Sequence, residues 1–75
     1  MTPGSGIQVS VNGEAVQVPS GCTIAELLQI LALDRARVAV EHNLRVVPKA
    51  EHSERRLNHG DRVEIVSFVG GGAGC

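Results

Sequence analysis

The pattern of apolar and polar residues near the start of the chain predicts two paired strands. Residues 7–11, IQVSV, alternate strictly, with the isoleucine and both valines on one face and the glutamine and serine on the other. This period of two is typical of a half-buried strand. Asn12 and Gly13 follow, and both residue types tolerate the positive φ angles of a tight hairpin turn. We therefore expect a return strand over residues 15–18, ended by Pro19, which has no N–H for the ladder.

A helix is predicted next, because the spacing of the apolar residues changes. Thr23 and Glu26 fit a capping box, in which each side chain accepts a hydrogen bond from the backbone N–H of the other residue. The apolar residues that follow occupy positions i, i+3, i+4 and i+7 of one stripe: Ile24, Leu27, Leu28 and Leu31. We expect this amphipathic helix to continue to about Leu33.

The second half of the chain predicts further strands separated by polar segments. Residues 34–37 form a polar break, after which strands are expected over residues 38–41, 45–47 and 62–68, and Pro48 ends the middle one. Residues 49–56, KAEHSERR, carry no apolar stripe. We expect this segment to be a solvated connector or a single turn, with Leu57 as its one anchor in the core.

Together these elements predict one small α+β domain. The apolar stripe of the helix can be buried only against one face of a sheet, which gives two layers. A β-grasp (ubiquitin-like) fold satisfies the order of elements, with a mixed four- to five-stranded sheet, one main helix packed across one face, and the last strand beside the first. We expect residues 1–6 to be a flexible N-terminus, residues 7–69 the folded domain, and residues 70–75 a flexible glycine-rich tail.

Composition and charge exclude several classes of function. The chain has 75 residues, a formal net charge of -1 and a single aromatic residue, Phe68. It therefore offers neither a basic field for phosphate backbones nor a stacking platform for bases. No apolar run approaches the roughly 18 residues that a membrane helix needs. Residues 1–6 have neither the basic nor the apolar region of a secretion signal, so we expect a cytoplasmic protein without nucleic-acid or membrane partners.

The sequence shows no catalytic or metal-binding constellation, so an enzyme is not expected. Cys22 and Cys75 lie far apart without a histidine at ligand spacing, and His42, His52 and His59 fall in different segments. We expect solvent-facing or loop histidines, and a Cys22 partly packed under the start of the helix. The alternative for Cys22 is a thiol whose pKa the helix N-terminus lowers modestly. Cys75 has no positively charged neighbour to activate its thiol.

The last predicted strand carries apolar residues on the face that should meet water. Val63 and Ile65 share one face, whereas positions 62, 64, 66 and 68 share the other, where an arginine and a glutamate precede Val66 and Phe68. Because the two charged residues should be solvated, we expect Val66 and Phe68 to be exposed and to form part of a docking surface. The alternatives are scattered surface apolarity, or a Phe68 side chain that curls over the edge of the core.

The glycines after this strand suggest a second functional feature. Gly70, Gly71 and Gly72 have no side chains, so this segment can thread a narrow channel that excludes bulkier residues. A carboxylate at the end of such a segment can be activated by ATP as an acyl-adenylate. The alternatives are a plain linker or a frayed end.

In their order and spacing, these motifs resemble the ThiS family of sulfur carriers, which are ubiquitin-like proteins of thiamin biosynthesis. The likeness covers residues 7–72 and rests on VNGEAVQVPSGCTIAELLQIL, VAVEHNLRVVPKAE and LNHGDRVEIVSFVGGG. These stretches contain an Asn-Gly hairpin, a Gly-x-Thr helix start with a Leu-Leu pair, Val-Val-Pro after the middle strand, Gly-Asp before the last strand, and a glycine tail.

The resemblance implies a protein cosubstrate. The carboxylate of Gly72 would be adenylated with ATP by a ThiF-type adenylating enzyme and converted to a thiocarboxylate, with sulfur drawn from cysteine through a cysteine desulfurase. The sulfur would then pass to the thiazole synthase ThiG, and the carrier itself would bind no cofactor. Gly70 and Gly71 would form a thin tether, and Val66 and Phe68 would lie on the surface that the partners grip.

Ala73-Gly74-Cys75 depart from the family pattern, because an amide at Gly72 cannot be adenylated. The resemblance then implies a precursor that a protease trims. The alternatives are three added residues or a carrier that has lost its activity. Two other functions also remain open: a sulfur carrier of another pathway (molybdopterin, cysteine or siderophore assembly), and a β-grasp binding module with an inert tail.

Overall fold

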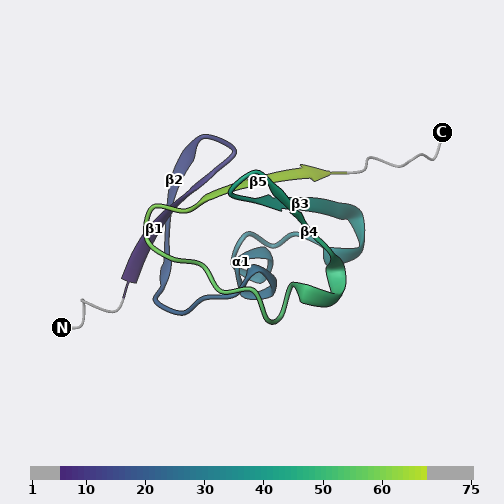
Figure 1. The fold of residues 1–75 in the computed structure, drawn as a ribbon, viewed down its shortest axis with the longest axis horizontal. Helices are drawn as coiled ribbons and strands as arrows, with labels where there is room; N and C mark the ends of the chain where they lie inside the picture. The colour runs from purple at the N-terminus through teal and green to yellow at the C-terminus, as the bar shows by residue number, and fades with distance from the viewer. Residues whose placement is uncertain (1–5, 68–75) are drawn as a thin grey trace.

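The computed structural model describes residues 6–67, in which a five-stranded sheet is covered on one face by the helix α1 (Figure 1). This arrangement agrees with the predicted α+β domain. In chain order the elements are β1 (Gly6–Val11), β2 (Glu14–Pro19), α1 (Ile24–Ile30), η2 (Arg35–Arg37), β3 (Val38–His42), β4 (Arg45–Val47), η3 (Lys49–Glu51) and β5 (Arg62–Ser67), where η denotes a 3₁₀-helix.

The first two strands form the predicted hairpin. Their antiparallel register ends at Val11↔Glu14, so Asn12 and Gly13 are the two loop residues. Both have positive φ angles, 51° and 88°. Two-residue loops of this kind match the natural twist of paired strands, which explains why this pair of residues specifies the turn.

The helix α1 begins as predicted but ends earlier. Its N-terminus has the full capping box: the Glu26 N–H donates to the Thr23 hydroxyl at 3.2 Å, and the Thr23 N–H donates to the Glu26 carboxylate at 2.9 Å. The expected end near Leu33 is wrong, because Ala32 adopts a left-handed φ of 60°. The N–H groups of Ala32 and Leu33 turn back to the carbonyls of Gln29 and Leu28 at 3.0 and 2.9 Å. This pattern is a Schellman motif, which ends a helix.

The polar segment after β4 holds a buried histidine that the sequence did not predict. A single 3₁₀ turn, η3, forms as expected, and Leu57 is anchored in the core with 2% exposure. Leu57 is not the only anchor, however, because His52 is 1% exposed and its Nε2 lies 3.1 Å from the Val47 carbonyl oxygen. The expectation of solvent-facing or loop histidines is confirmed for His59, which is exposed in the turn before β5, but it is wrong for His42, which is buried at the end of β3.

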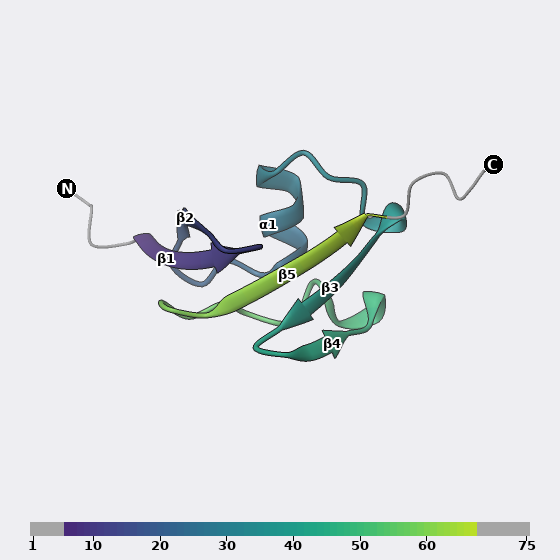
Figure 2. The ribbon, with the colours of Figure 1, turned by 90° about the horizontal axis from the view of Figure 1, so that it is seen from above.

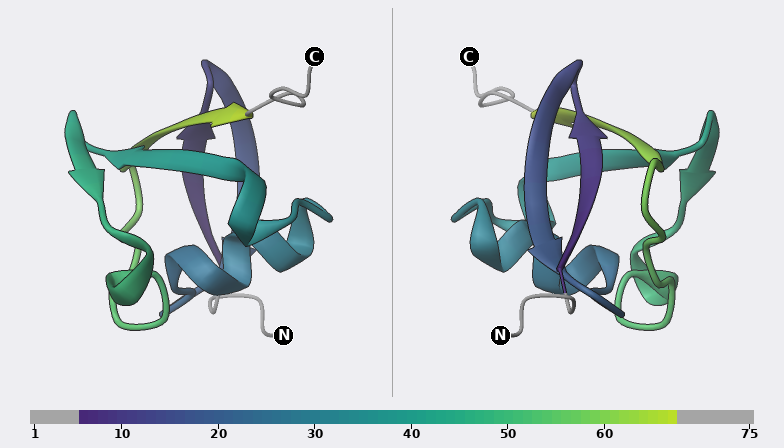
Figure 3. Two further views of the ribbon diagram at one scale, coloured as in Figure 1. Left: turned by 90° about the vertical axis from the view of Figure 1, so that its right-hand side faces the viewer. Right: turned by 90° about the vertical axis from the view of Figure 1, so that its left-hand side faces the viewer.

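The last strand lies between the first strand and β3. The order across the sheet is β2-β1-β5-β3-β4, and β5 runs parallel to β1 and antiparallel to β3. Figure 2 shows β5 along the middle of the sheet, beside β3, and Figure 3 shows α1 on one side of the strands in both views. The prediction that the last strand lies beside the first is confirmed.

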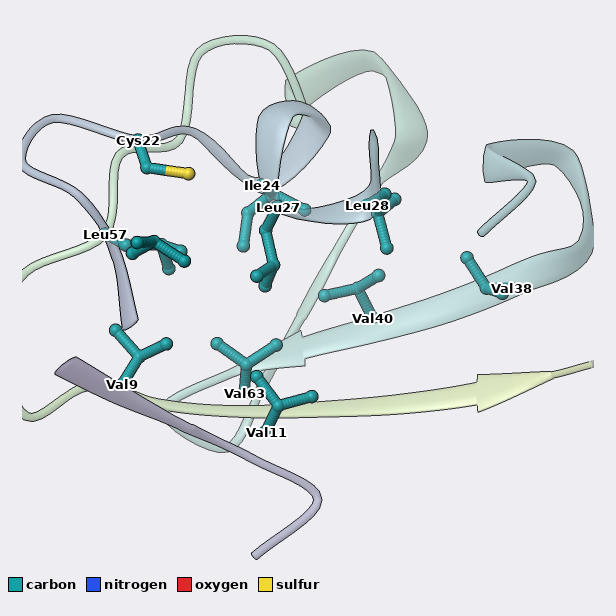
Figure 4. Close-up of a cluster of buried hydrophobic side chains, with 11 residues drawn as sticks. Val9, Val11, Cys22, Ile24, Leu27, Leu28, Val38, Val40, Leu57 and Val63 are labelled. Atoms are coloured by element: carbon teal, nitrogen blue, oxygen red, sulfur yellow. The ribbon is translucent and has the colours of Figure 1, made fainter. Parts of the chain in front are cut away.

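The core fills the space between α1 and the sheet. Figure 4 shows Ile24, Leu27 and Leu28 of the helix directed at Val40 and Val63 of the sheet, and all five are almost completely buried. Each such side chain contributes about 1.5–3 kcal/mol by leaving water. Because Val63 belongs to β5, this packing fixes the strand that leads to the glycine segment.

Candidate functional site

The candidate site is the end of β5, since Ser67 is the last described residue before the predicted tail. Of the predicted site residues the structure describes Val66. Phe68 and the glycines Gly70, Gly71 and Gly72 lie outside the described residues, as do Ala73-Gly74-Cys75. Val66 is 60% exposed, which confirms that it faces water. Its role in docking stays a prediction.

Val66 belongs to a mixed apolar and acidic surface on the side of the sheet away from α1. It lies opposite Ala39 on β3, and Glu64 lies opposite Glu41 in the same register. Glu41 in turn lies opposite Val46 of β4, which is 69% exposed. Residues opposite each other on neighbouring strands project to the same face. We call these five residues the outer-face patch.

The charges of the outer-face patch are only partly balanced. The guanidinium of Arg62 donates to one carboxylate oxygen of Glu64 at 3.0 and 3.3 Å. Within residues 6–67, Glu41 forms no ion pair with a basic side chain. Like charges directly opposite each other on paired strands repel. A partner with a basic side chain between apolar groups would therefore complement this surface.

A side-chain clamp that the sequence did not reveal holds the outgoing end of β5. The Asn12 side chain accepts a hydrogen bond from the Ile65 N–H at 2.8 Å and donates one to the Ile65 carbonyl at 3.1 Å. The amide group thus takes the place of a strand neighbour where β1 has already turned away. The sequence signal, Asn12-Gly13, is explained by the hairpin alone, so nothing in it pointed to this second role.

The incoming end of β5 is fixed by a cluster around Asp61. The carboxylate accepts hydrogen bonds from His42 Nε2 at 2.7 Å, the Asn58 N–H at 2.8 Å and the Asn43 amide at 3.2 Å. Burial raises the pKa of Asp61, but the hydrogen bonds from His42, Asn58 and Asn43 outweigh it and leave that pKa below its usual range. Asn43 also accepts from the Arg62 N–H at 2.8 Å, so the cluster reaches the first residue of the strand.

A groove opens on the inner face of the sheet beside the outgoing end of β5. Its volume is about 470 Å³. It is lined by the β1–β2 hairpin from Val11 to Val16, by Leu31 and Leu33 after α1, and by Val38, Ile65 and Ser67 at the ends of β3 and β5. We call it the inner-face groove, and it lies on the opposite side of the sheet from the outer-face patch.

Cys22 is a structural residue and not an activated thiol. It is 2% exposed and packs with the core cluster under the start of α1. Burial first, and the charge of Glu26 second, raise the pKa of the Cys22 thiol. The alternative of a pKa lowered by the helix is therefore wrong, and the packed position is confirmed. Among residues 6–67 no cluster of three or more His, Cys, Asp or Glu side chains could hold a metal ion.

Comparison with known proteins places these features in a family context. A sequence model described as the ThiS family matches residues 5–72, so the match ends at Gly72. The chain is 29% identical over 66 residues to the sulfur carrier protein ThiS of Escherichia coli, covering 88% of this chain and 100% of that protein. It is also 40% identical over 67 residues to a thiazole synthase of Paramagnetospirillum magneticum, covering 89% of this chain. The chain spans about a fifth (21%) of the length of that synthase.

A solved structure with the same fold supports the same assignment. The crystal structure of the thiamine biosynthesis protein ThiS from Geobacter metallireducens is 32% identical, with a TM-score of 0.75 over 88% of this chain and 100% of that chain. This similarity confirms the predicted β-grasp fold. In the part of the chain that the structure describes, no helix is long and apolar enough to cross a membrane.

Proposed function

The chain belongs to the ThiS family, and from this premise we propose that it is a sulfur carrier of thiamin biosynthesis. The observation that carries the proposal is the extent of the family match, which runs through the whole domain and the glycines and ends at Gly72. The named ThiS relatives, one of them covered over its full length, support the same function.

The proposed chemistry takes place at the carboxyl group of Gly72. A carboxylate oxygen attacks the α-phosphorus of ATP on a ThiF-type adenylating enzyme, pyrophosphate leaves, and an acyl-adenylate forms. The terminal sulfur of a persulfide, loaded from cysteine by a cysteine desulfurase, then attacks the acyl carbon, and AMP leaves. A second thiol attacks the inner sulfur of the resulting acyl disulfide, so that a disulfide forms and the Gly72 thiocarboxylate is released as the sulfur donor. Gly70 and Gly71 serve as the tether, because a chain without side chains fits a channel that excludes bulkier residues.

This chemistry requires that Gly72 carry a free carboxylate. In the present sequence Ala73 follows, so the Gly72 carbonyl belongs to a peptide bond and cannot be adenylated. We propose that a protease removes Ala73-Gly74-Cys75 before the carrier becomes active. The end of the family match at Gly72 supports this cleavage position.

The described residues support a docking role for the outer-face patch. Val46 and Val66 expose apolar surface on either side of the carboxylates of Glu41 and Glu64, and Val66 lies on the strand that leads to the tail. A partner that binds there holds the tail close to its own active site. Phe68, which directly follows Ser67 in the sequence, is proposed to extend this surface.

We propose the thiazole synthase ThiG as the acceptor of the sulfur. The similarity to a fifth of the length of a protein named thiazole synthase supports this link, since a ThiS-like segment occurs in the same polypeptide as that activity. A carrier for molybdopterin, cysteine or siderophore assembly would use the same terminal chemistry. Transfer assays with purified thiazole synthase and with the corresponding molybdopterin synthase subunit distinguish these acceptors.

The test is an intact-mass measurement on two forms of the chain. The form that ends at Gly72 is incubated with a purified ThiF-type enzyme, ATP and a cysteine desulfurase with cysteine. We expect a mass gain equal to the exchange of one oxygen atom for one sulfur atom. The full-length chain should keep its mass until a protease is added. An unchanged mass of the trimmed chain, under conditions in which the enzyme modifies a known carrier, contradicts the proposal.

Alanine substitutions separate a carrier from a binding module with an inert tail. Gly71→Ala and Gly72→Ala add a methyl group where a narrow channel leaves no room, so the trimmed variants should lose thiocarboxylate formation. Both variants should still bind the adenylating enzyme through the domain. Full activity of both variants in thiazole formation would instead show that the tail does not enter an active site.

A further inference from the structure

The edge of β5 that faces β1 is open beyond Asn12. The two strands pair only at Ser10↔Arg62 and Val11↔Val63, because β1 turns away at the hairpin. The side-chain amide of Asn12 then forms hydrogen bonds with the N–H and C=O of Ile65, so both of these groups are already hydrogen-bonded. Figure 2 shows β5 continuing past the tip of β1 while β3 remains alongside.

The backbone alternation of β5 directs the polar groups of Ser67 to this open edge. Arg62 bonds to Asn43 on the β3 side of the strand, whereas Val63 and Ile65 bond to Asn12 on the β1 side. Ser67 lies two residues after Ile65, so its N–H and C=O point to the β1 side as well. Within residues 6–67 no strand pairs with Ser67 on that side, and Ser67 is exposed.

The inner-face groove reaches Ser67 at this end of β5. Ile65 and Ser67 line it together with the apolar residues Leu31, Leu33 and Val16. Its volume of about 470 Å³ falls within the range of roughly 300–1,000 Å³ that holds a ligand of many atoms. Open strand edges next to apolar pockets are the feature by which proteins bind extended peptides: the backbone pairs with the edge and alternate side chains fill the pocket.

We propose that the open edge of β5 and the inner-face groove together bind an extended segment of a partner protein. The segment hydrogen-bonds to the N–H and C=O of Ser67 and places an apolar side chain between Leu33, Val16 and Ile65. Glu14 lines the same groove, so a basic residue next to that apolar side chain is favoured. This site is separate from the tail chemistry and from the outer-face patch, and it does not depend on the proposed function.

The lining of the groove favours one kind of occupant. The apolar residues Leu31, Leu33 and Val16 favour an apolar side chain, and the carboxylate of Glu14 favours a basic residue beside it. We therefore assign the site to an extended segment of a partner protein with this pattern.

The test is a nuclear magnetic resonance titration of the ¹⁵N-labelled full chain with the peptide acetyl-Lys-Val-Thr-Leu-Thr-Val-Lys-amide. We expect chemical-shift changes at Ser67, Leu33 and Val16, and slower hydrogen exchange of the Ser67 N–H at saturation. Ser67→Pro removes this N–H without breaking a bond to β3, and should weaken binding between about twofold and tenfold, the range for one hydrogen bond. Leu33→Glu places a charge in the groove and should weaken binding by at least about tenfold.

Two control variants test whether a loss of binding comes from the Ser67 N–H and from the groove. Ser67→Ala retains the N–H and should therefore lose less affinity than Ser67→Pro. Ile30→Glu places the same charge as Leu33→Glu on an exposed apolar position outside the groove, and it should bind the peptide as the unmodified chain does. The proposal is overturned by the absence of shifts at millimolar peptide, or by shifts confined to the outer-face patch. A concentration-dependent dimer that Ser67→Pro abolishes would show that a second copy of the chain binds the open edge of β5. Slow exchange of the Ser67 N–H in the free monomer would show that the chain itself covers the edge. Either result would also overturn it.

Discussion

Replacing Asn12 with glycine should destabilise the domain even though glycine suits the backbone at this position. The φ of Asn12 is 51°, a left-handed value that glycine adopts without strain. The variant loses two hydrogen bonds to Ile65, at 2.8 and 3.1 Å. Two such bonds are worth about 1–3 kcal/mol in total. Because both are exposed to water, we expect a loss of free energy of unfolding near the lower end, about 1–2 kcal/mol.

Asn12→Asp tests the reasoning further, because a carboxylate keeps only one of the two bonds. At neutral pH it accepts from the Ile65 N–H but repels the Ile65 carbonyl oxygen, to which the amide donated. A protonated carboxyl can both accept from the Ile65 N–H and donate to the Ile65 carbonyl, as the amide does. The difference in stability between Asn12→Asp and the unmodified chain should therefore be smaller at pH 3 than at pH 7.

The assay is urea unfolding followed by far-ultraviolet circular dichroism, with hydrogen exchange of the Ile65 N–H as a local readout. Asn43→Gly is the matched control, since Asn43 has the same φ of 51° and its side chain holds the other end of β5 through Arg62. It should lower the global stability without selectively increasing exchange at Ile65. Equal stability of Asn12→Gly and the unmodified chain, with unchanged exchange at Ile65, would refute the assignment of a clamp.

Three further predictions concern stability, acid sensitivity and reactivity. Ala32→Gly should stabilise the domain by about 0.5–1 kcal/mol in urea unfolding, because it removes a left-handed alanine, whereas Ala50→Gly in η3 should not stabilise it. Asp61→Asn should be less stable than the unmodified chain at pH 7. The pKa of Asp61 is lowered in the folded state, so its carboxylate stabilises the fold at pH values above the usual aspartate pKa of about 3.9. The difference in free energy of unfolding between the two proteins should shrink as the pH falls below about 3.9, and a constant difference from pH 7 to pH 2.5 would contradict this prediction. In a Cys75→Ser variant, Cys22 should react with iodoacetamide at pH 7.5 only after urea unfolds the chain, since its thiol is buried and the thiol pKa is raised. Rapid labelling of the folded protein would show that Cys22 is accessible.

Local sequence signals predicted most of the fold correctly. The hairpin at Asn12-Gly13, the capping box at Thr23 and the short strand before Pro48 each depend on residues close together in the chain. The apolar stripe of α1 then required a sheet to cover it. The alternation in the last strand correctly placed Val66 on the exposed face.

The errors arose where tertiary structure or an unusual residue overrides the local pattern. Ala32 ends α1 in a conformation that usually needs glycine, so the apolar stripe continued past the true end. His42 is buried because Asp61, 19 positions away in the sequence, accepts its hydrogen bond. His52 is buried at the end of η3, where its Nε2 lies within hydrogen-bond distance of the Val47 carbonyl oxygen. No periodicity can show such partners.

In the candidate site, too, local sequence predicted one feature and contacts between distant segments produced the others. Exposure of Val66 followed from alternation along one strand. The clamp from Asn12 to Ile65 joins residues 53 positions apart, and the inner-face groove combines segments from both halves of the chain. Neither feature could be inferred before the register between β1 and β5 was known.

The parallel pairing of β1 with β5 has a consequence for the timing of folding during synthesis. The hairpin and α1 can form while the ribosome is still translating, but the middle of the sheet stays incomplete until residues 62–67 emerge. Closing contacts over so long a separation is slow relative to local structure formation. A chain truncated before β5 would expose the apolar faces of β1 and β3 and become a target for chaperones and proteases. The strand that completes the domain is also the one that presents the glycine segment, so only a finished and folded copy can enter the proposed sulfur-transfer cycle.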